Sequence, residues 1–166
     1  MTYRDLIRDI ALTVIVFAVV FGALYAFSGV WPPMVSVTSL SMTPHLEKGD
    51  LVFIQGLDRA NITTYESAES LNYSSFGEPG DVIVYKPFGT GTPIIHRVIR
   101  YVNQGEPMWQ NGPPAPYAGY ITQGDNNSIC DQEAANICPG SPVKPEWIIG
   151  IARYRVPYLG YIRMLI

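Results

Sequence analysis

A long uncharged segment near the N-terminus constrains this chain more than any other feature. No Asp, Glu, Lys or Arg occurs between Asp9 and Glu47, and residues 10–27 read IALTVIVFAVVFGALYAF, apolar on every face of a helix. Extended to Val30, such a helix is roughly 30 Å long, the hydrocarbon thickness of a bilayer. Residues 10–30 are therefore predicted to span a membrane once.

Basic residues before this segment predict its orientation. Arg4 and Arg8 precede the span, whereas the first cation after it is Lys48. Cytoplasmic flanks of membrane spans carry an excess of Lys and Arg. We therefore expect residues 1–9 in the cytoplasm and residues 31–166 outside it, in a single-pass protein of the cell membrane.

A secretory signal peptide that is removed after export is the alternative interpretation of the same segment. Ala26-Phe27-Ser28 resembles a small-x-small cleavage site, and the two arginines resemble the basic start of such a peptide. The apolar core of a signal peptide usually has roughly 7 to 15 residues, and this one is longer, which favours a retained anchor. Both interpretations export the rest of the chain.

Composition narrows the class of the exported part. Residues 31–166 are enough for one domain with a single hydrophobic core. Charged residues make up only 15% of the 166-residue chain, and 15 Gly and 14 Pro supply many turns, which disfavours a bundle of long helices. A formal net charge of −3 without a Lys/Arg-rich block disfavours nucleic acid as a partner.

Short apolar runs bounded by Gly, Pro, Asn or Asp predict β-strands in the exported part. These runs are residues 35–37, 51–54, 82–85, 94–95, 98–102 and 148–152. Gly49-Asp50 and Gly80-Asp81 each precede a run, as a turn with positive φ at Gly would. The fold class is therefore predicted as mainly β with one N-terminal transmembrane α-helix. Surface loops are expected at residues 56–79 and 105–119.

The C-terminal tail allows two interpretations. Residues 148–166 contain Arg153, Arg155 and Arg163 but no acidic residue, interleaved with tyrosine and aliphatic side chains. Basic and aromatic residues suit a membrane surface. The same residues could equally form a closing strand and a tail packed on the core.

Three separate segments hold side chains with catalytic potential. Residues 39–44 read SLSMTP, residues 94–98 read IIHRV, and residues 124–127 read GDNN, followed by Asp131. Each has a plain structural explanation when it is considered alone. A serine can cap a turn, a strand histidine can complete a hydrogen bond, and Asp and Asn stabilise turns through their own backbone.

Taken together, the three segments resemble the type I signal peptidases. The order and spacing of S-x-S-M-x-P, I-I-H-R-V and G-D-N-N with an Asp six residues on are similar to that family, as is the single anchor. His96 stands where bacterial members have Lys, and so resembles the archaeal and endoplasmic-reticulum branch. The resemblance implies a β-rich catalytic domain over residues 31–166. It implies a serine endopeptidase that cleaves signal peptides from exported preproteins after small, Ala-x-Ala-like residues.

The resemblance also implies a role for each matching residue. Ser41 is the implied nucleophile, and its weakly nucleophilic hydroxyl needs a base within hydrogen-bond reach. His96 is the implied general base, because an imidazole titrates near pH 6.5 without much tuning. A carboxylate that fixes the imidazole tautomer is then useful. Asp131 is the preferred match for this carboxylate and Asp125 the alternative, the other one holding the turn.

The neighbours of these residues receive lesser roles. The backbone N–H of Ser41 and the hydroxyl of Ser39 are expected to line the oxyanion hole, although Leu40 stands where the family usually has Gly. His45 is expected to pack in a surface loop. Arg97 is expected to be solvated or paired, because it points away from His96 on a strand.

Partners and covalent links follow from the same resemblance and from export. The implied partners are preprotein signal peptides, the lipid bilayer and the protein-export translocon, with no cofactor. An extended substrate is expected to add a strand beside residues 35–40. Cys130 and Cys138 flank Asp131 and, in an exported chain, could form a disulfide or remain free thiols. Two cysteines without a Cys/His cluster argue against structural zinc.

A non-catalytic membrane-anchored β-domain is the alternative function. It would be an inactive scaffold subunit or a copper carrier that uses His45, His96, one cysteine and Met108. A blue-copper site needs a histidine shortly after its cysteine ligand. Neither Cys130 nor Cys138 has one downstream, which disfavours the copper carrier.

Overall fold

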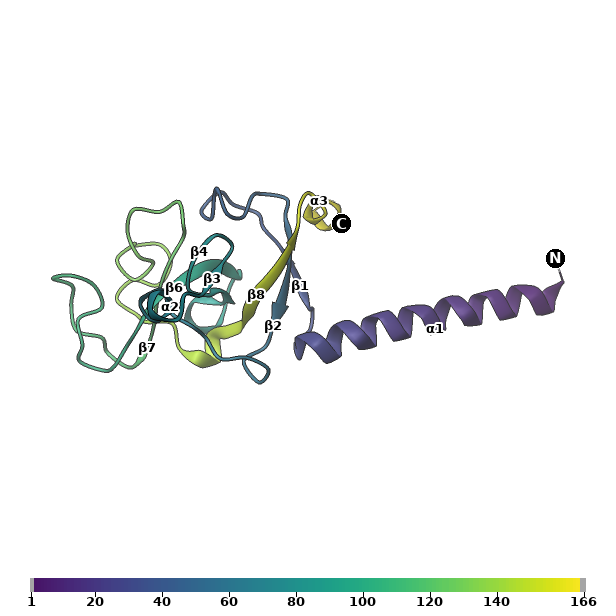
Figure 1. Cartoon of the computed structure of the whole chain (residues 1–166), viewed down its shortest axis with the longest axis horizontal. Helices are drawn as coiled ribbons and strands as arrows, with labels where there is room; N and C mark the ends of the chain where they lie inside the picture. Colours follow the sequence, from purple (N-terminus) through teal and green to yellow (C-terminus); the bar gives the residue numbers. More distant parts are fainter. Residues whose placement is uncertain (1, 165–166) are drawn as a thin grey trace.

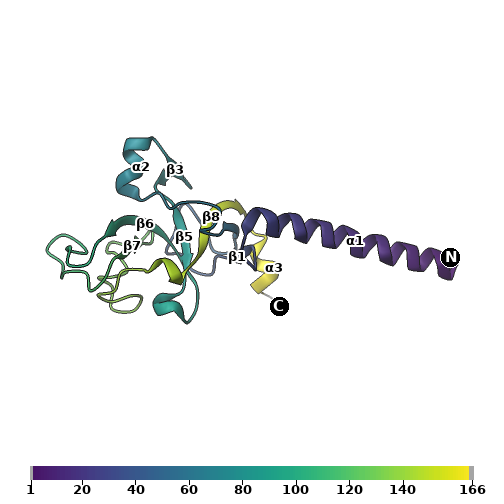
Figure 2. The ribbon, with the colours of Figure 1, turned by 90° about the horizontal axis from the view of Figure 1, so that it is seen from below.

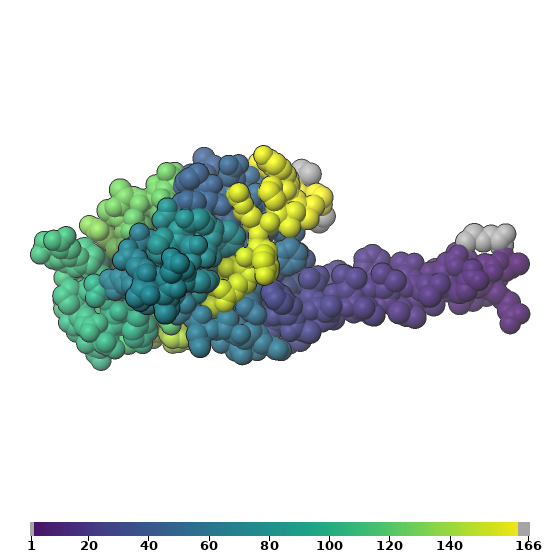
Figure 3. Space-filling view, in the orientation of Figure 1, coloured from purple at the N-terminus to yellow at the C-terminus, as the bar shows by residue number. Residues whose placement is uncertain are grey.

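The computed structural model describes residues 2–164, a long apolar helix joined to a β-rich body (Figure 1). Helix α1 (Tyr3–Ser28) begins with a capping box between Thr2 and Asp5 and ends at Gly29, which has a φ of 72°. No residue of its most apolar 18-residue window is buried, and Figure 3 shows the helix projecting from the body. A helix of this length and composition can cross a membrane.

Six antiparallel strands form the main sheet, in the order β1-β2-β8-β5-β6-β7. They are β1 (Met34–Ser36), β2 (Leu51–Gln55), β5 (Val82–Tyr85), β6 (Ile94–Val102), β7 (Gly119–Gln123) and β8 (Ile148–Val156). The mainly β fold predicted from the sequence is therefore confirmed. The runs 94–95 and 98–102 belong to one strand, and β7 was missed because GYITQ contains only two apolar side chains.

The segment predicted as a surface loop at residues 56–79 contains regular structure. It holds α2 (Tyr65–Leu71) and a two-stranded sheet of β3 (Ser74–Ser75) and β4 (Glu78–Pro79), which lie to one side of the main sheet (Figure 2). The prediction failed because its Ser and Thr residues cap the helix: Thr64 Oγ1 accepts the backbone N–H of Ser67 at 3.2 Å. The helical elements that remain are η1 (Pro87–Gly89), η2 (Pro145–Trp147) and α3 (Gly160–Met164).

The core anchors the segment that carries the serine motif. The buried side chains of its first cluster are Val37, Met42, Leu46, Val52, Ile54, Val82, Val84 and Ala152. Met42 and Leu46 follow Ser41 in the chain and are fully buried. Burying side chains of this size is worth about 1.5–3 kcal/mol each. The turn around Ser41 is therefore fixed to the sheet although it contains no helix or strand.

The two Gly-Asp turns bind the C-terminal strand. Gly49 and Gly80 have the positive φ values that the sequence predicts. The carboxylates that follow them are buried, and each accepts a hydrogen bond from an arginine of β8. Arg153 Nη1 lies 3.0 Å from Asp81, and Arg155 Nη1 lies 3.2 Å from Asp50. Two of the three tail arginines thus bind the protein itself.

The rest of the tail packs beside the first of these turns. The backbone N–H of Gly160 donates to the carbonyl of Gly49 at 2.8 Å, so the start of α3 is held against the body. Residues 148–153 and Gly160 therefore follow the packed interpretation, whereas the side chains of residues 154–159 are exposed. The Arg163 side chain and residues 165–166 lie outside what the structure describes, and contact of the tail with lipid stays a prediction.

Candidate active site

Three remote segments meet at one hydrogen-bonded chain of side chains. Ser41 lies in the turn after β1, His96 lies in β6, and Asp131 lies in the loop after β7. His96 Nε2 is 2.9 Å from Ser41 Oγ, and His96 Nδ1 is 2.7 Å from Asp131 Oδ2. His96 and Asp131 are buried, whereas Ser41 is half-buried and lines a groove.

The hydrogen bonds between these three side chains allow a proton to move from Ser41 to His96. A carboxylate is only an acceptor, so the imidazole donates from Nδ1 to Asp131 and leaves Nε2 free to accept the Ser41 hydroxyl proton. A hydroxyl so polarised can attack a carbonyl carbon. The geometry is that of nucleophile, base and orienting acid.

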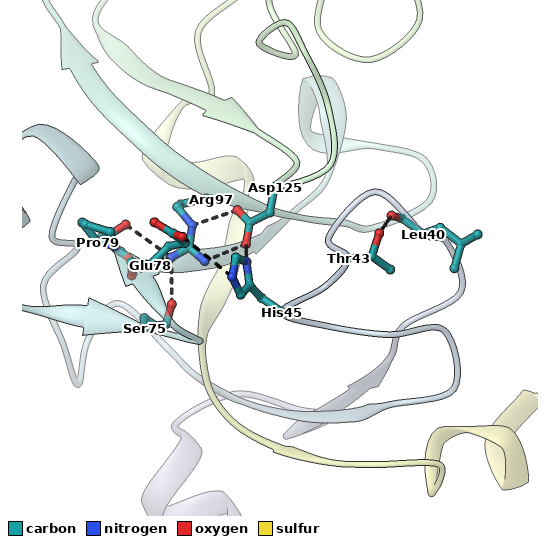
Figure 4. Close-up of polar contacts among 9 residues, drawn as sticks. Leu40, Thr43, His45, Ser75, Glu78, Pro79, Arg97 and Asp125 are labelled. Atoms are coloured by element: carbon teal, nitrogen blue, oxygen red, sulfur yellow. Dashed lines mark hydrogen bonds and ion pairs between the residues drawn. The ribbon is translucent and has the colours of Figure 1, made fainter.

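Asp125 binds side chains other than His96. It accepts two hydrogen bonds from Arg97, from Nε at 2.8 Å and from Nη2 at 2.7 Å, and its Oδ2 lies 2.8 Å from His45 Nδ1 (Figure 4). Of the two carboxylates that the sequence offers as orienter of the base, Asp131 is the one in contact with the imidazole. Asp125 instead connects the segment after Ser41 to strand β6.

Arg97 is buried and paired, which is one of the two outcomes that the sequence allows. Its Nη1 donates to the backbone carbonyls of Ser75 and Gly80, each at 2.8 Å, so one guanidinium holds the β3–β4 hairpin as well as Asp125 (Figure 4). His45 completes the cluster, with Nε2 lying 3.8 Å from Glu78 Oε1. We call these side chains the Arg97–Asp125–His45 cluster.

The GDNN turn packs directly on the backbone of the serine turn. The backbone N–H of Asn126 donates to the carbonyl of Ser41 at 2.8 Å, and Asn126 Nδ2 donates to the carbonyl of Leu40 at 3.3 Å. A Cβ at Gly124 would lie 2.6 Å from the Ser41 carbonyl oxygen. Sequence reasoning assigned the motif to a turn and missed this contact.

The residues expected at the oxyanion hole lie beside the serine. Ser39 Oγ is 3.1 Å from Ser41 Oγ, so its hydroxyl is within reach of the atom that would attack. Leu40 points away from the core and is exposed. A side chain at this position therefore fits without displacing the two serines.

A groove of about 430 Å³ opens beside the serine. It is lined by Ser36, Thr38, Ser39, Ser41, His96, Asn127, Asn136, Ile137 and residues 92–95. An adjoining, more apolar hollow of about 340 Å³ shares residues 92–95 and adds Val35 and Val84. Strand β1 is at the edge of the sheet, and the edge of a sheet is the position at which an extended peptide can add a strand.

The two cysteines are not joined in the structure, which is one of the two states that the sequence allows. Both are free thiols. Cys138 belongs to a buried cluster with Ile83 and Tyr85, and Cys130 belongs to another with Val102 and Met108. Burial raises the pKa of both thiols, that of Cys138 to about 11.

Two residues that contact Asp131 were not predicted from the sequence. The Tyr85 hydroxyl and the Thr122 hydroxyl each lie 2.7 Å from Asp131 Oδ2. The signal in the sequence was weak. Tyr85 ends the apolar run VIVY, where its polar tip needs a partner if it is buried.

The ligands of the copper-carrier alternative are not brought together. His96 and His45 bind different carboxylates, and Met108 packs in one cluster with Cys130. Within residues 2–164, no group of three or more His, Cys, Asp or Glu side chains is arranged to hold a metal ion.

Comparison with known proteins gives similarity over most of the chain. The signal peptidase complex catalytic subunit sec11 of Aspergillus oryzae is 30% identical over 149 residues, which covers 86% of this chain and 70% of that protein. The subunit of the same name in Schizosaccharomyces pombe is 31% identical over 135 residues, covering 78% and 65%. SEC11 of Colletotrichum graminicola is 29% identical over 134 residues, covering 81% and 63%. No protein-family model matches the chain.

Proposed function

The chain belongs to the signal peptidase family, and on that premise we propose that it is a membrane-bound serine endopeptidase that removes N-terminal signal peptides from exported preproteins. One observation carries the proposal: Ser41, His96 and Asp131 form an unbroken hydrogen-bonded chain beside a groove. Such a chain is the arrangement that acyl transfer from a serine requires.

The proposed mechanism follows from these contacts. As Ser41 Oγ attacks the scissile carbonyl carbon, His96 Nε2 takes the hydroxyl proton, and Asp131 stabilises the resulting imidazolium. The backbone N–H of Ser41 and the hydroxyl of Ser39 donate to the developing oxyanion. The imidazolium then protonates the leaving amine, and a water molecule hydrolyses the acyl-enzyme by the reverse sequence of proton transfers.

The groove supports a preference for small residues before the cut. An extended peptide that pairs with β1 would direct alternate side chains toward the sheet. On that face it meets Val35, Val84, Ile94 and Ile95, which line the apolar hollow. Shallow apolar walls accept Ala and exclude larger or charged side chains, because burying those is sterically or electrostatically costly.

The anchor supports action on membrane-held substrates. We propose residues 1–9 as the cytoplasmic N-terminus, residues 10–30 as the transmembrane anchor and residues 31–166 as the extracytoplasmic catalytic domain, in the cell membrane. Trp31, exposed at the end of α1, suits the bilayer interface. Confining enzyme and signal peptide to one surface raises the effective concentration of the scissile bond. The lipid bilayer and the export translocon are the proposed partners besides the preprotein.

Replacement of the nucleophile and the orienting acid tests this function. Ser41→Ala should lower kcat for cleavage of a preprotein in detergent or liposomes by about 10³-fold or more. Asp131→Asn should lower kcat by about 10²-fold or more, because the amide cannot stabilise the imidazolium as a carboxylate does.

Controls distinguish loss of chemistry from loss of fold. Ser70→Ala, on the exposed face of α2, should keep wild-type activity, and circular dichroism should show Ser41→Ala folded. Near-wild-type processing by Ser41→Ala would remove Ser41 from the role of nucleophile. A larger kcat loss for Asp125→Asn than for Asp131→Asn, at unchanged melting temperature, would reassign the orienting acid.

A further inference from the structure

Asp131 is bound through one oxygen only. His96 Nδ1, Tyr85 Oη and Thr122 Oγ1 each lie 2.7 Å from Asp131 Oδ2. Asp131 Oδ1 is buried and has no hydrogen-bond partner among the described residues. A buried carboxylate keeps its negative charge only when hydrogen bonds replace the water that it has lost. All of that stabilisation therefore falls on the oxygen that faces the proposed base.

The register of three neighbouring strands places the two hydroxyls on either side of the imidazole. Ile83 of β5 pairs with His96 of β6, so Tyr85, two residues after Ile83, is a diagonal neighbour of His96 on the same face. Val98 of β6 pairs with Thr122 of β7, which makes Thr122 the diagonal neighbour on the other side. Both side chains are buried, and both lie on the face of the sheet that carries His96.

We propose that Tyr85 is a positioning residue of this peptidase: with Thr122 it holds Asp131 Oδ2 against His96 Nδ1 and draws part of the carboxylate's negative charge away from the imidazole. This inference rests on the proposed function, since it gives the orienting acid its own support. The role is an indirect one, because Tyr85 is hydrogen-bonded to Asp131 and its side chain is not among those that line the groove.

Both hydroxyls are held as donors. Burial, and then the adjacent Asp131 carboxylate, raises the pKa of Tyr85 above its ordinary value of 10.0, so the phenol keeps its proton wherever the enzyme works. The other titratable group that acts on the phenol, the Cys138 thiol, is neutral there because burial raises its pKa to about 11. Thr122 is fixed by its backbone N–H, which donates to Gln132 Oε1 at 3.0 Å.

Loss of one donor has two consequences for the base. With fewer hydrogen bonds on Oδ2, more negative charge faces His96, and an opposite charge favours the protonated imidazole. Asp131 is also freer to rotate about its side-chain bonds, since one of its three anchors is gone. The first effect shifts the pH dependence of catalysis, and the second slows it.

Tyr85→Phe in the full-length chain tests the inference, because it removes only the hydroxyl. In detergent with a preprotein substrate, kcat should fall about tenfold at an unchanged KM, and the acid limb of the kcat/KM profile should move up by about half a pH unit. Thr122→Val should move the limb in the same direction. Tyr73→Phe is the matched control, since Tyr73 Oη also donates to a buried carboxylate, Asp81, at 2.7 Å; it should leave the profile in place.

A titration followed by NMR gives a readout that does not depend on activity. The chain has two histidines, so a His45→Gln variant assigns both imidazole signals. In Tyr85→Phe the midpoint for His96 should rise by the same half unit or so, and that for His45 should not move. A profile and a midpoint that both stay in place, with activity falling only as the melting temperature falls, would overturn the inference.

The two proposals fail in different ways. If Ser41→Ala still cleaves preproteins, the proposed function is wrong, yet the NMR midpoint of His96 in Tyr85→Phe still reports whether the phenol acts on the base through Asp131. If Ser41→Ala is inactive and Tyr85→Phe leaves both readouts unchanged, the peptidase stands and Tyr85 is only a core residue.

Discussion

A single glycine sets how closely the GDNN turn approaches the serine. A Cβ on Gly124 would lie 2.6 Å from the carbonyl oxygen of Ser41 and 2.9 Å from His96 Nε2. Cβ atoms essentially never lie within 3.0 Å of another heavy atom, and the first of these contacts is with backbone, which cannot rotate away. The glycine of this motif therefore serves close approach between two backbones.

Gly124→Ala should reduce kcat by about 10²-fold, because displacement of the nucleophile by about 1 Å costs that much. Steady-state kinetics on the preprotein measure the loss. Gly22→Ala is the control, since a Cβ there meets nothing within 4 Å, and its activity should be that of the wild type. Full activity of Gly124→Ala would mean that the turn and the serine move together without harm.

The thiols should react only slowly while the chain is folded. A thiolate is the reactive form, and burial raises the pKa of Cys130 and Cys138, the latter to about 11. The native protein should therefore resist iodoacetamide at pH 8, with alkylation of Cys138 rising only as the pH nears 11. The raised pKa also means that burial of the protonated thiol stabilises the fold below pH 9 and that this contribution is lost between about pH 9 and 11.

Mass spectrometry of the protein unfolded without reductant completes this measurement. Two alkylated cysteines are expected, since both thiols are free in the structure. If neither cysteine is alkylated until the unfolded protein is reduced, the exported protein carries a disulfide between Cys130 and Cys138.

At the scale of elements, the Arg97–Asp125–His45 cluster joins parts that the sheet alone does not hold together. Arg97 belongs to β6, Asp125 to the GDNN turn, and His45 to the segment after Ser41. The guanidinium also binds carbonyls of the β3–β4 hairpin. The pair of Arg97 and Asp125 is buried, so neither charge can turn to water for a substitute partner.

Asp125→Ala should destabilise the protein by about 3–5 kcal/mol, because it leaves a buried guanidinium without its counter-charge. Chemical denaturation of the body in detergent measures this change. Asp58→Ala is the matched control: it removes a carboxylate that pairs with Arg59 at the exposed surface, and such pairs contribute little. Equal stability of the two variants would contradict the structural role of the cluster.

The elements also explain what could be read from the sequence. Ser41, His96 and Asp131 could be predicted as one group because motifs of fixed spacing carry them, and strands such as VIVY could be predicted because buried runs are locally apolar. Tyr85 and Thr122 were missed because their contact with Asp131 is set by register across β5, β6 and β7. Which residues face each other on strands that are far apart in the chain cannot be read from any one local segment of sequence.

At the scale of the molecule, the anchor is joined to the body by direct contacts at its end. Ser28 Oγ donates to the carbonyl of Ile54 at 2.8 Å, and the N–H of Gly56 donates to the carbonyl of Ser28 at 2.7 Å. The Phe27 and Tyr154 rings lie 6.4 Å apart. The last turn of α1 is thus attached to β2 and β8 (Figure 1). This attachment limits how far the β-rich body, and Ser41 with it, can tilt relative to the helix.

Orientation of this assembly in the membrane should depend on the two N-terminal arginines. Replacing Arg4 and Arg8 together by Glu removes both basic side chains of residues 1–9, so a larger share of chains should insert with the body on the cytoplasmic side. The chain carries its own reporters, because the sequons at Asn61 and Asn72 are exposed. Glycosylation in microsomes therefore marks a lumenal body.

Arg4→Lys with Arg8→Lys is the matched control, since it keeps both charges, and Asn61→Gln with Asn72→Gln identifies the glycosylated band. We expect the wild type and the Lys variant to be modified alike and the Glu variant less. Equal glycosylation of the Glu variant would show that the arginines do not set orientation. If the wild type is unmodified and protease added to intact microsomes digests its body, the proposed topology is wrong. Ser41 would then lie on the side of the membrane from which preproteins depart.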